Sequence, residues 1–116
     1  GIDMLASEIV LKLKNEYDIK LECAIPCMEQ SKGWNSKAKL RYQNIVDHAD
    51  IVTYVAHSLY FDGCMEERNK YMVENSSRII AVYGGRFGGG GTKKTIEYAQ
   101  KKGLEVILIE PFYQDE

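Results

Sequence analysis

Six of the ten glycines in the chain lie within one short stretch, residues 84–92, which reads Gly-Gly-Arg-Phe-Gly-Gly-Gly-Gly-Thr. An apolar run over residues 79–83 precedes this stretch, and a helix-like segment from Thr92 to Lys102 follows it. Glycines let the backbone approach a ligand closely and adopt positive φ, while the free N–H groups at the start of a helix attract anions. The pattern therefore predicts a phosphate-binding loop.

The two common phosphate-loop motifs are both absent from this stretch. It contains no G-x-G-x-x-G, and a P-loop requires Lys followed by Ser or Thr, whereas this chain has Thr92-Lys93. Thr92 can cap the following helix or offer its hydroxyl to a phosphate, and these two roles are compatible. The alternative interpretation is a surface hairpin, which the flanking strand and helix disfavour.

A second group of polar residues lies on the helix that we expect over residues 64–75. Met65 and Met72 are seven residues apart and should share a buried face, with Arg68 and Asn69 between them on that face. Polar side chains in such surroundings need partners. One interpretation pairs Arg68 with a ligand phosphate or carboxylate and Asn69 with a sugar or the loop backbone. The other pairs Arg68 with a protein carboxylate and lets Asn69 cap the backbone.

The remaining polar candidates have simpler roles. Asp3 stands where the N-cap of a first helix belongs, but if Gly1 ends another glycine turn, Asp3 can accept a hydrogen bond from a ribose hydroxyl. Trp34 can stack on a base, although a lone Trp more often packs in a core or at its rim. His48 and His57 lack the partners needed for metal binding or triad chemistry, so we predict no metal site and no required cofactor.

Composition narrows the class of protein. The 116 residues are 45% hydrophobic and 28% charged with a net charge of −2, which fits one globular domain and gives no basic footprint for nucleic acid. No apolar run approaches the roughly 20 residues that a membrane-spanning helix needs. The three cysteines form neither a disulfide framework nor a zinc motif, so we expect reduced thiols in a cytoplasmic protein.

Helical and strand patterns alternate along the whole chain. The expected helices cover residues 4–17, about 35–49, 64–75 and 92–102, and the expected strands cover residues 20–25, 51–55, 79–83 and 105–109. This order predicts an α/β fold, a Rossmann-like three-layer sandwich with a mainly parallel sheet covered by helices on both faces. Ligands of such folds bind beyond the carboxyl ends of the strands, where the glycine stretch lies.

Four segments in this order and spacing resemble the YpsA-like group (DUF1273) of the SLOG superfamily. They are Gly1–Asp3, Arg68–Val73, Ile80–Tyr83 and Gly89–Thr92. The resemblance extends over essentially all 116 residues. It implies a Rossmann-like sandwich that forms a single domain over residues 1–116.

The resemblance also implies a ligand site made of two loops. Gly1 and Asp3 would belong to the first loop, and Gly89, Gly90, Gly91 and Thr92 would form the second, with Arg68 and Asn69 nearby. Members of this superfamily are thought to bind nucleotides or derivatives such as ADP-ribose or NAD-like molecules between these loops.

Family members carry two further strands and a helix before the first loop. We therefore expect this chain, which begins at Gly1, to be an N-terminally truncated domain. Missing central strands would leave exposed sheet edges. A second copy of the chain could cover those edges in a homodimer.

The resemblance argues against hydrolysis. LOG-type phosphoribohydrolases are similar to G-G-x-G-T-x-x-E, and Thr95 occupies the position of that final Glu. Glu97 lies about 200° further around a helix and cannot take its place. The leading prediction is non-catalytic binding or sensing of a nucleotide-derived ligand. The alternatives are an N-glycosidic hydrolase that uses Glu66 or Glu97, and single-stranded DNA binding, which the lack of a basic stripe disfavours.

Overall fold

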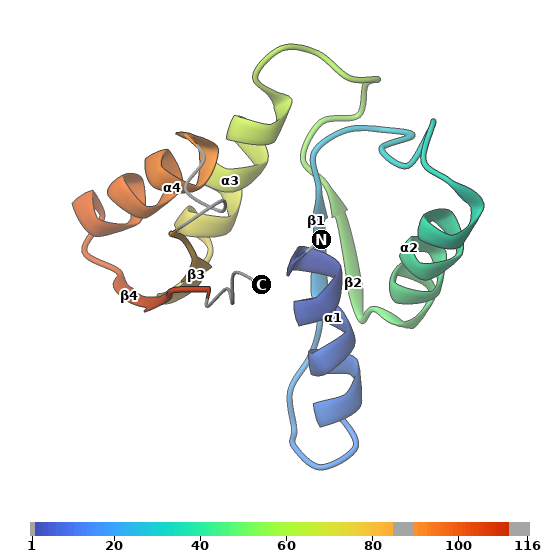
Figure 1. Ribbon diagram of the computed structural model, residues 1–116, viewed down its shortest axis with the longest axis horizontal. Coiled ribbons are helices and arrows are strands. Elements are labelled where there is room, and N and C mark those ends of the chain that lie inside the picture. Colours follow the sequence, from blue (N-terminus) through green and yellow to red (C-terminus); the bar gives the residue numbers. More distant parts are fainter. Residues whose placement is uncertain (1, 85–89, 112–116) are drawn as a thin grey trace, which may run out of the picture. The chain divides into compact units, whose positions relative to one another are not determined.

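The computed structural model describes residues 2–84 and 90–111, where helices and strands alternate as the sequence predicts (Figure 1). The elements are α1 (Ile2–Leu13), β1 (Glu22–Ile25), α2 (Ser36–His48), β2 (Ile51–Tyr54), α3 (Cys64–Glu74), β3 (Arg78–Val82), α4 (Gly90–Lys101) and β4 (Glu105–Ile109). The α/β class is confirmed, and the order is that of a Rossmann-like fold.

The chain divides into two compact units, residues 1–64 and 65–116. Each unit contains one pair of parallel strands, β1 with β2 in the first and β3 with β4 in the second. A single helix connects the strands of each pair, since parallel neighbours need a crossover connection. The predicted parallel pairing is therefore confirmed within each unit.

In the first unit, α2 begins as the sequence predicts. Asn35 is its N-cap, and the side-chain Oδ1 of Asn35 accepts a hydrogen bond of 2.8 Å from the backbone N–H of Ala38. Ile45 on α2 is buried, together with Ile25 and Cys27 at the end of β1. The buried side chains of this unit therefore include residues of α2 and residues around the end of β1.

The first helix differs from the prediction in bounds and burial. It starts at Ile2, which makes Asp3 the second helical residue rather than the N-cap. It ends at Leu13, where an i→i+3 bond from Glu16 N–H to the Leu13 carbonyl closes a turn in place of the expected continuation to residue 17. Its apolar stripe, which includes Ile9, stays exposed. The reason is that α1 contacts α2 through a different face, along which Glu8 pairs with Arg41.

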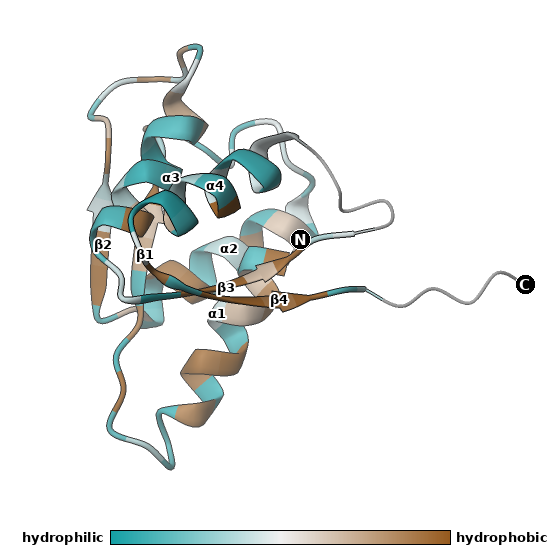
Figure 2. Cartoon of the chain, turned by 90° about the vertical axis from the view of Figure 1, so that its left-hand side faces the viewer, coloured by the Kyte–Doolittle hydropathy of each residue, from teal (hydrophilic) through white to brown (hydrophobic). Residues whose placement is uncertain are grey.

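In the second unit, α4 packs on both strands of the β3–β4 pair. Helix α3 lies beside α4, and the Tyr98 hydroxyl donates to Glu74 Oε1 at 2.8 Å between them (Figures 1 and 2). The two strands are predominantly apolar, as their brown colour in Figure 2 shows. Ala81 on β3 and Ala99 on α4 are buried, whereas Ile80 on the opposite face of the sheet is 66% exposed.

Helix α3 corrects one prediction about burial. Met65 and Met72 do not share a buried face, because their exposed fractions are 42% and 39%. Val73 is the buried residue near the end of this helix, and Cys64 is the buried residue at its start. The helix carries no continuous apolar stripe, so its packing is set by these two smaller side chains. No helix among the described residues has the length and apolar character to cross a bilayer.

Candidate functional site

The N-terminus of α4 is formed by glycines. The helix begins at Gly90, two residues before the Thr92 start that the sequence predicts, so Gly90 and Gly91 belong to the first helical turn rather than to a loop. Their backbone N–H groups are among the four at the start of a helix that have no intrahelical acceptor. Apart from chain neighbours and the backbone of the helix itself, a Cβ atom added at either glycine would meet no atom of the described residues within 4 Å. A helix start of this kind can receive an anion.

Thr92 and Thr95 follow on the same helix. Thr92 is half-buried in the first turn. The Thr95 hydroxyl donates a hydrogen bond of 2.9 Å to the backbone carbonyl of Gly91. Thr95 thus has a neutral hydroxyl that is already bonded within the helix.

Arg68 and Asn69 are half-buried on α3 and contact each other. Arg68 Nε donates to Asn69 Oδ1 at 2.9 Å, and a terminal guanidinium nitrogen of Arg68 lies 4.0 Å from Met65 Sδ. Asn69 therefore orients the guanidinium group, a role that the sequence analysis did not foresee. Consecutive helical residues diverge by about 100° and rarely bond each other, so the sequence carried little signal for this pair.

One side-chain hydrogen bond joins helices α3 and α4. The Tyr98–Glu74 hydrogen bond fixes one point where α3 and α4 meet. Arg68 is six residues before Glu74, and Thr92 is six residues before Tyr98, which in each helix corresponds to about 9 Å. The predicted counter-charge on α3 and the predicted anion site on α4 therefore belong to the same unit.

The other predicted ligand residues are placed differently. Asp3 belongs to the first unit, where it is exposed in the first turn of α1 and its backbone carbonyl accepts a hydrogen bond from the Ser7 hydroxyl at 2.9 Å. Gly1 and Gly89 lie outside the described residues. Five of the eight predicted residues thus belong to the second unit, on α3 and at the start of α4, namely Arg68, Asn69, Gly90, Gly91 and Thr92.

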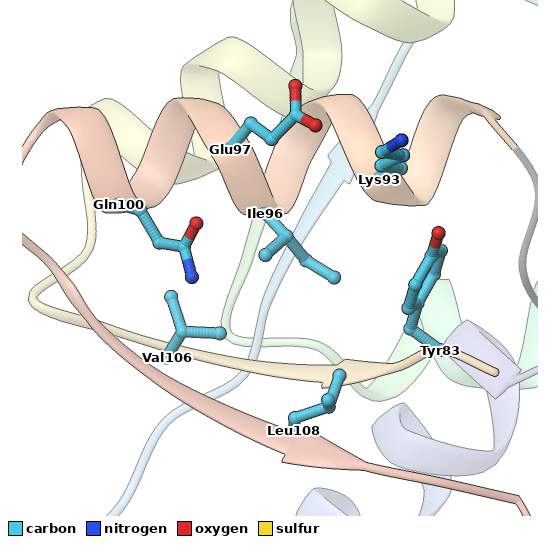
Figure 3. A pocket seen from close by; sticks show the side chains of 7 residues that line it. All are labelled: Tyr83, Lys93, Ile96, Glu97, Gln100, Val106 and Leu108. Atoms are coloured by element: carbon cyan, nitrogen blue, oxygen red, sulfur yellow. The ribbon is translucent and has the colours of Figure 1, made fainter.

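A pocket of about 320 Å³ lies alongside α4 in the second unit (Figure 3). Its lining residues come from the end of β3, from α4 and from β4, and they are Tyr83, Lys93, Ile96, Glu97, Gln100, Val106 and Leu108. The sequence analysis missed this pocket. The only available signal was the spacing of Lys93, Ile96, Glu97 and Gln100, which places them along one side of a helix.

Aromatic and thiol groups of the first unit have structural roles. The Trp34 and Tyr42 rings meet edge to face with their centroids 5.4 Å apart, and burial is the main cause that raises the pKa of Tyr42 to about 12. Burial and a hydrogen bond with Cys64 raise the pKa of the Cys27 thiol, so it stays protonated at neutral pH.

The histidines show no metal chemistry in the described part of the chain. His48 Nδ1 lies 2.7 Å from the backbone oxygen of Asn44, within its own helix. No group of three or more His, Cys, Asp or Glu side chains that could hold a metal ion occurs among the described residues.

Comparison with known proteins gives relatives along almost the whole chain. The family described as the YspA SLOG family (YpsA) matches residues 1–113. A UPF0398 protein of Brevibacillus brevis is 36% identical over 86 residues, covering 72% of this chain and 45% of the relative. A UPF0398 protein of Bacillus thuringiensis strain Al Hakam is 31% identical over 105 residues, covering 89% of this chain and 56% of the relative.

A third relative, a UPF0398 protein of Macrococcus caseolyticus, is 33% identical over 85 residues, which are 72% of this chain and 46% of that protein. The chain therefore spans about half the length of these curated relatives. The family match includes the glycine start of α4 and the Arg68–Asn69 pair. The chain belongs to the YpsA group of the SLOG family.

Proposed function

We propose that this chain binds a nucleotide-derived ligand, such as ADP-ribose, an NAD-like molecule or a nucleotide phosphate, in a non-catalytic regulatory role. The observation that carries the proposal is the start of α4, where Gly90 and Gly91 place the first backbone N–H groups of the helix at the positive end of the helix dipole. Membership of the SLOG family supports the same class of ligand.

In the proposed complex, the phosphates contact the first turn of α4 and the Thr92 hydroxyl. Arg68, which donates a hydrogen bond to Asn69, supplies the counter-charge from α3. Charge-assisted hydrogen bonds of this kind are roughly twice as strong as neutral ones.

The non-catalytic part of the proposal rests on Thr95. A hydroxyl that donates to the Gly91 carbonyl cannot act as the carboxylate that assists cleavage of an N-glycosidic bond. We propose that the protein works in the cytoplasm as a sensor or regulator, with the bound nucleotide derivative as its signal.

Isothermal titration calorimetry with ADP-ribose, NAD and common nucleotides tests the proposal. We expect at least one of them to bind, and Arg68→Ala to weaken that binding about tenfold or more. Arg78→Ala is the matched control, because Arg78 pairs with Glu105 through side chains that are 60% and 58% exposed and contribute little.

Two results would contradict the proposal. One is the absence of binding for all these ligands, or binding that Arg68→Ala and Arg78→Ala leave equally unchanged. The other concerns the regulatory role alone. Release of free base from nucleoside monophosphates would show that the protein is a hydrolase, with a carboxylate such as Glu97 acting in place of the missing one.

A further inference from the structure

The pocket beside α4 has apolar walls and polar ends. Ile96 projects from the helix over Val106 and Leu108, which come from β4 and form the floor (Figure 3). The Tyr83 ring stands at the end nearest the start of α4, and the Gln100 amide points towards Val106 at the other end. A flat apolar ring with polar edges fits such a space.

The polar side chains of this pocket make few contacts with the protein. Among the described residues, none of the side chains of Tyr83, Lys93, Glu97 and Gln100 forms a hydrogen bond or ion pair. A Gln amide offers both a donor and an acceptor on one planar group. The group that points into the pocket can therefore bond a ligand that presents an acceptor beside a donor.

We propose that this pocket binds the adenine ring of the nucleotide-derived ligand, a proposal that rests on the function proposed above. A Gln amide pairs in bidentate fashion with adenine, accepting from the N6 amino group and donating to N7. Ile96 covers one face of the ring and Leu108 the other, while Tyr83 closes the pocket end. The volume of about 320 Å³ is at the lower limit of ligand pockets and suits a base rather than a whole dinucleotide.

The position of the pocket along α4 supports this assignment. Lys93 follows Thr92 directly and lines the pocket, so the pocket begins one residue from the proposed phosphate site. Gln100 is seven residues beyond Lys93, which is about 10 Å along the helix. Thr92, the proposed phosphate-site residue nearest the pocket, is eight residues before Gln100, or about 12 Å along the helix, a separation that an extended nucleoside diphosphate can span. Lys93 stands between them and neutralises phosphate charge.

Titration of the full chain with three probes tests the pocket separately from the phosphate site. The probes are ADP-ribose, adenosine and ribose 5-phosphate. Gln100→Trp fills the pocket from an exposed helix position, and Lys101→Trp places the same side chain on the neighbouring exposed position that does not line it. Gln100→Ala removes only the amide, and circular dichroism verifies that each variant is folded.

We expect Gln100→Trp to lower the affinity for adenosine and ADP-ribose about tenfold or more. The affinity for ribose 5-phosphate should stay within about twofold of that of the parent. Gln100→Ala should weaken adenosine and ADP-ribose by a smaller factor, and Lys101→Trp should change none of the three. Binding of ADP-ribose that neither Gln100 variant alters would overturn the pocket assignment while the proposed function stands. Binding of adenosine without either phosphate probe would overturn the proposed function and retain the pocket. Failure of all three probes would overturn both.

Discussion

Helices α2 and α4 occupy equivalent places in the two units, since each leaves one strand of a parallel pair and leads to the next. Their starts differ. The first turn of α2 is closed by the Asn35 side chain, which accepts from the Ala38 N–H. The first turn of α4 begins with Gly90 and Gly91, which have no side chains to offer.

The segment before α2 is also bonded within the protein. Lys32 N–H donates to the Glu29 carbonyl and Trp34 N–H donates to the Ser31 carbonyl, each at 3.0 Å. Two helices with the same topological position can therefore differ in function because of a few residues at their N-termini. Where a side chain caps the helix the end is structural, and where glycines leave it open the end can bind an anion.

The largest expected effect tests whether the first unit depends on its own core. Ile45→Ala removes a side chain that is 4% exposed, and we expect the free energy of unfolding to fall by about 2–5 kcal/mol. Urea denaturation monitored by Trp34 fluorescence measures this change, because Trp34 packs against Tyr42, which lies on α2 together with Ile45. Ile80→Ala, at a side chain that is 66% exposed, should change it by no more than about 0.5 kcal/mol. Equal effects would contradict this description of the core.

The second prediction concerns a negative charge placed at the start of α4. Gly91→Asp places a carboxylate in the first helical turn, where it favours the helix but repels an anionic ligand. We expect the affinity for ADP-ribose to fall about tenfold, or about 1.4 kcal/mol, by calorimetry. Gly91→Ala adds only the Cβ, for which there is space, and should bind as the parent does. Unchanged binding by Gly91→Asp would remove α4 from the site.

The third prediction concerns removal of the side chain that caps the start of α2. Asn35→Ala removes the hydrogen bond to Ala38 N–H, and we expect a loss of about 1 kcal/mol in unfolding free energy, measured in urea. Asn35→Ser should restore most of it, because Ser is also a good N-cap. ADP-ribose affinity should be the same in both variants. A change in affinity would mean that the α2 end is part of a ligand site.

The smallest effect concerns the acid sensitivity of the first unit. Asp50 accepts hydrogen bonds from Lys14 Nζ at 2.6 Å and from Leu21 N–H at 2.8 Å, which lower its pKa below the ordinary value of 3.8. Because the folded pKa is the lower one, this stabilisation is present above pH 3.8 and is lost as the pH falls through the folded value.

Denaturation at neutral pH and at a pH below the folded pKa of Asp50 checks this prediction. Asp50→Asn should destabilise the protein slightly at neutral pH and show a smaller loss of stability on acidification. The control is Glu105→Gln in the second unit, whose exposed pair with Arg78 should matter little. Identical acid dependence of Asp50→Asn and the parent would contradict the assignment.

Local sequence patterns predicted the elements well where one signal dominated. The last strand has the predicted bounds, Glu105–Ile109, because an apolar β-rich run is flanked by a glycine turn and Pro111. The expected start of the second helix, at about residue 35, agrees with the observed N-cap Asn35, because Asn is among the residue types that cap helices. The predicted start of α4, Thr92, lies two residues after the observed start, Gly90. The reason is that glycine has low helix propensity, although the first turn of a helix tolerates it.

Features that depend on tertiary packing were not predictable. The exposure of Met65 and Met72 follows from which side of α3 meets its neighbours, and spacing alone does not give this. The Arg68–Asn69 hydrogen bond joins consecutive residues that helix geometry normally separates. The pocket beside α4 requires β4 to pass beneath the helix, so no local motif marks it.

The labelling rates of the buried thiols can report how often the first unit opens locally. Cys27 and Cys64 are buried, whereas Cys23 on β1 is half-buried, so a maleimide can reach the first two only when that part of the unit opens. Their labelling rates therefore measure local opening in the absence of denaturant. Cys64 is also the first residue of α3. Its labelling rate would therefore show whether a ligand bound at the start of α4 changes local opening at the start of α3.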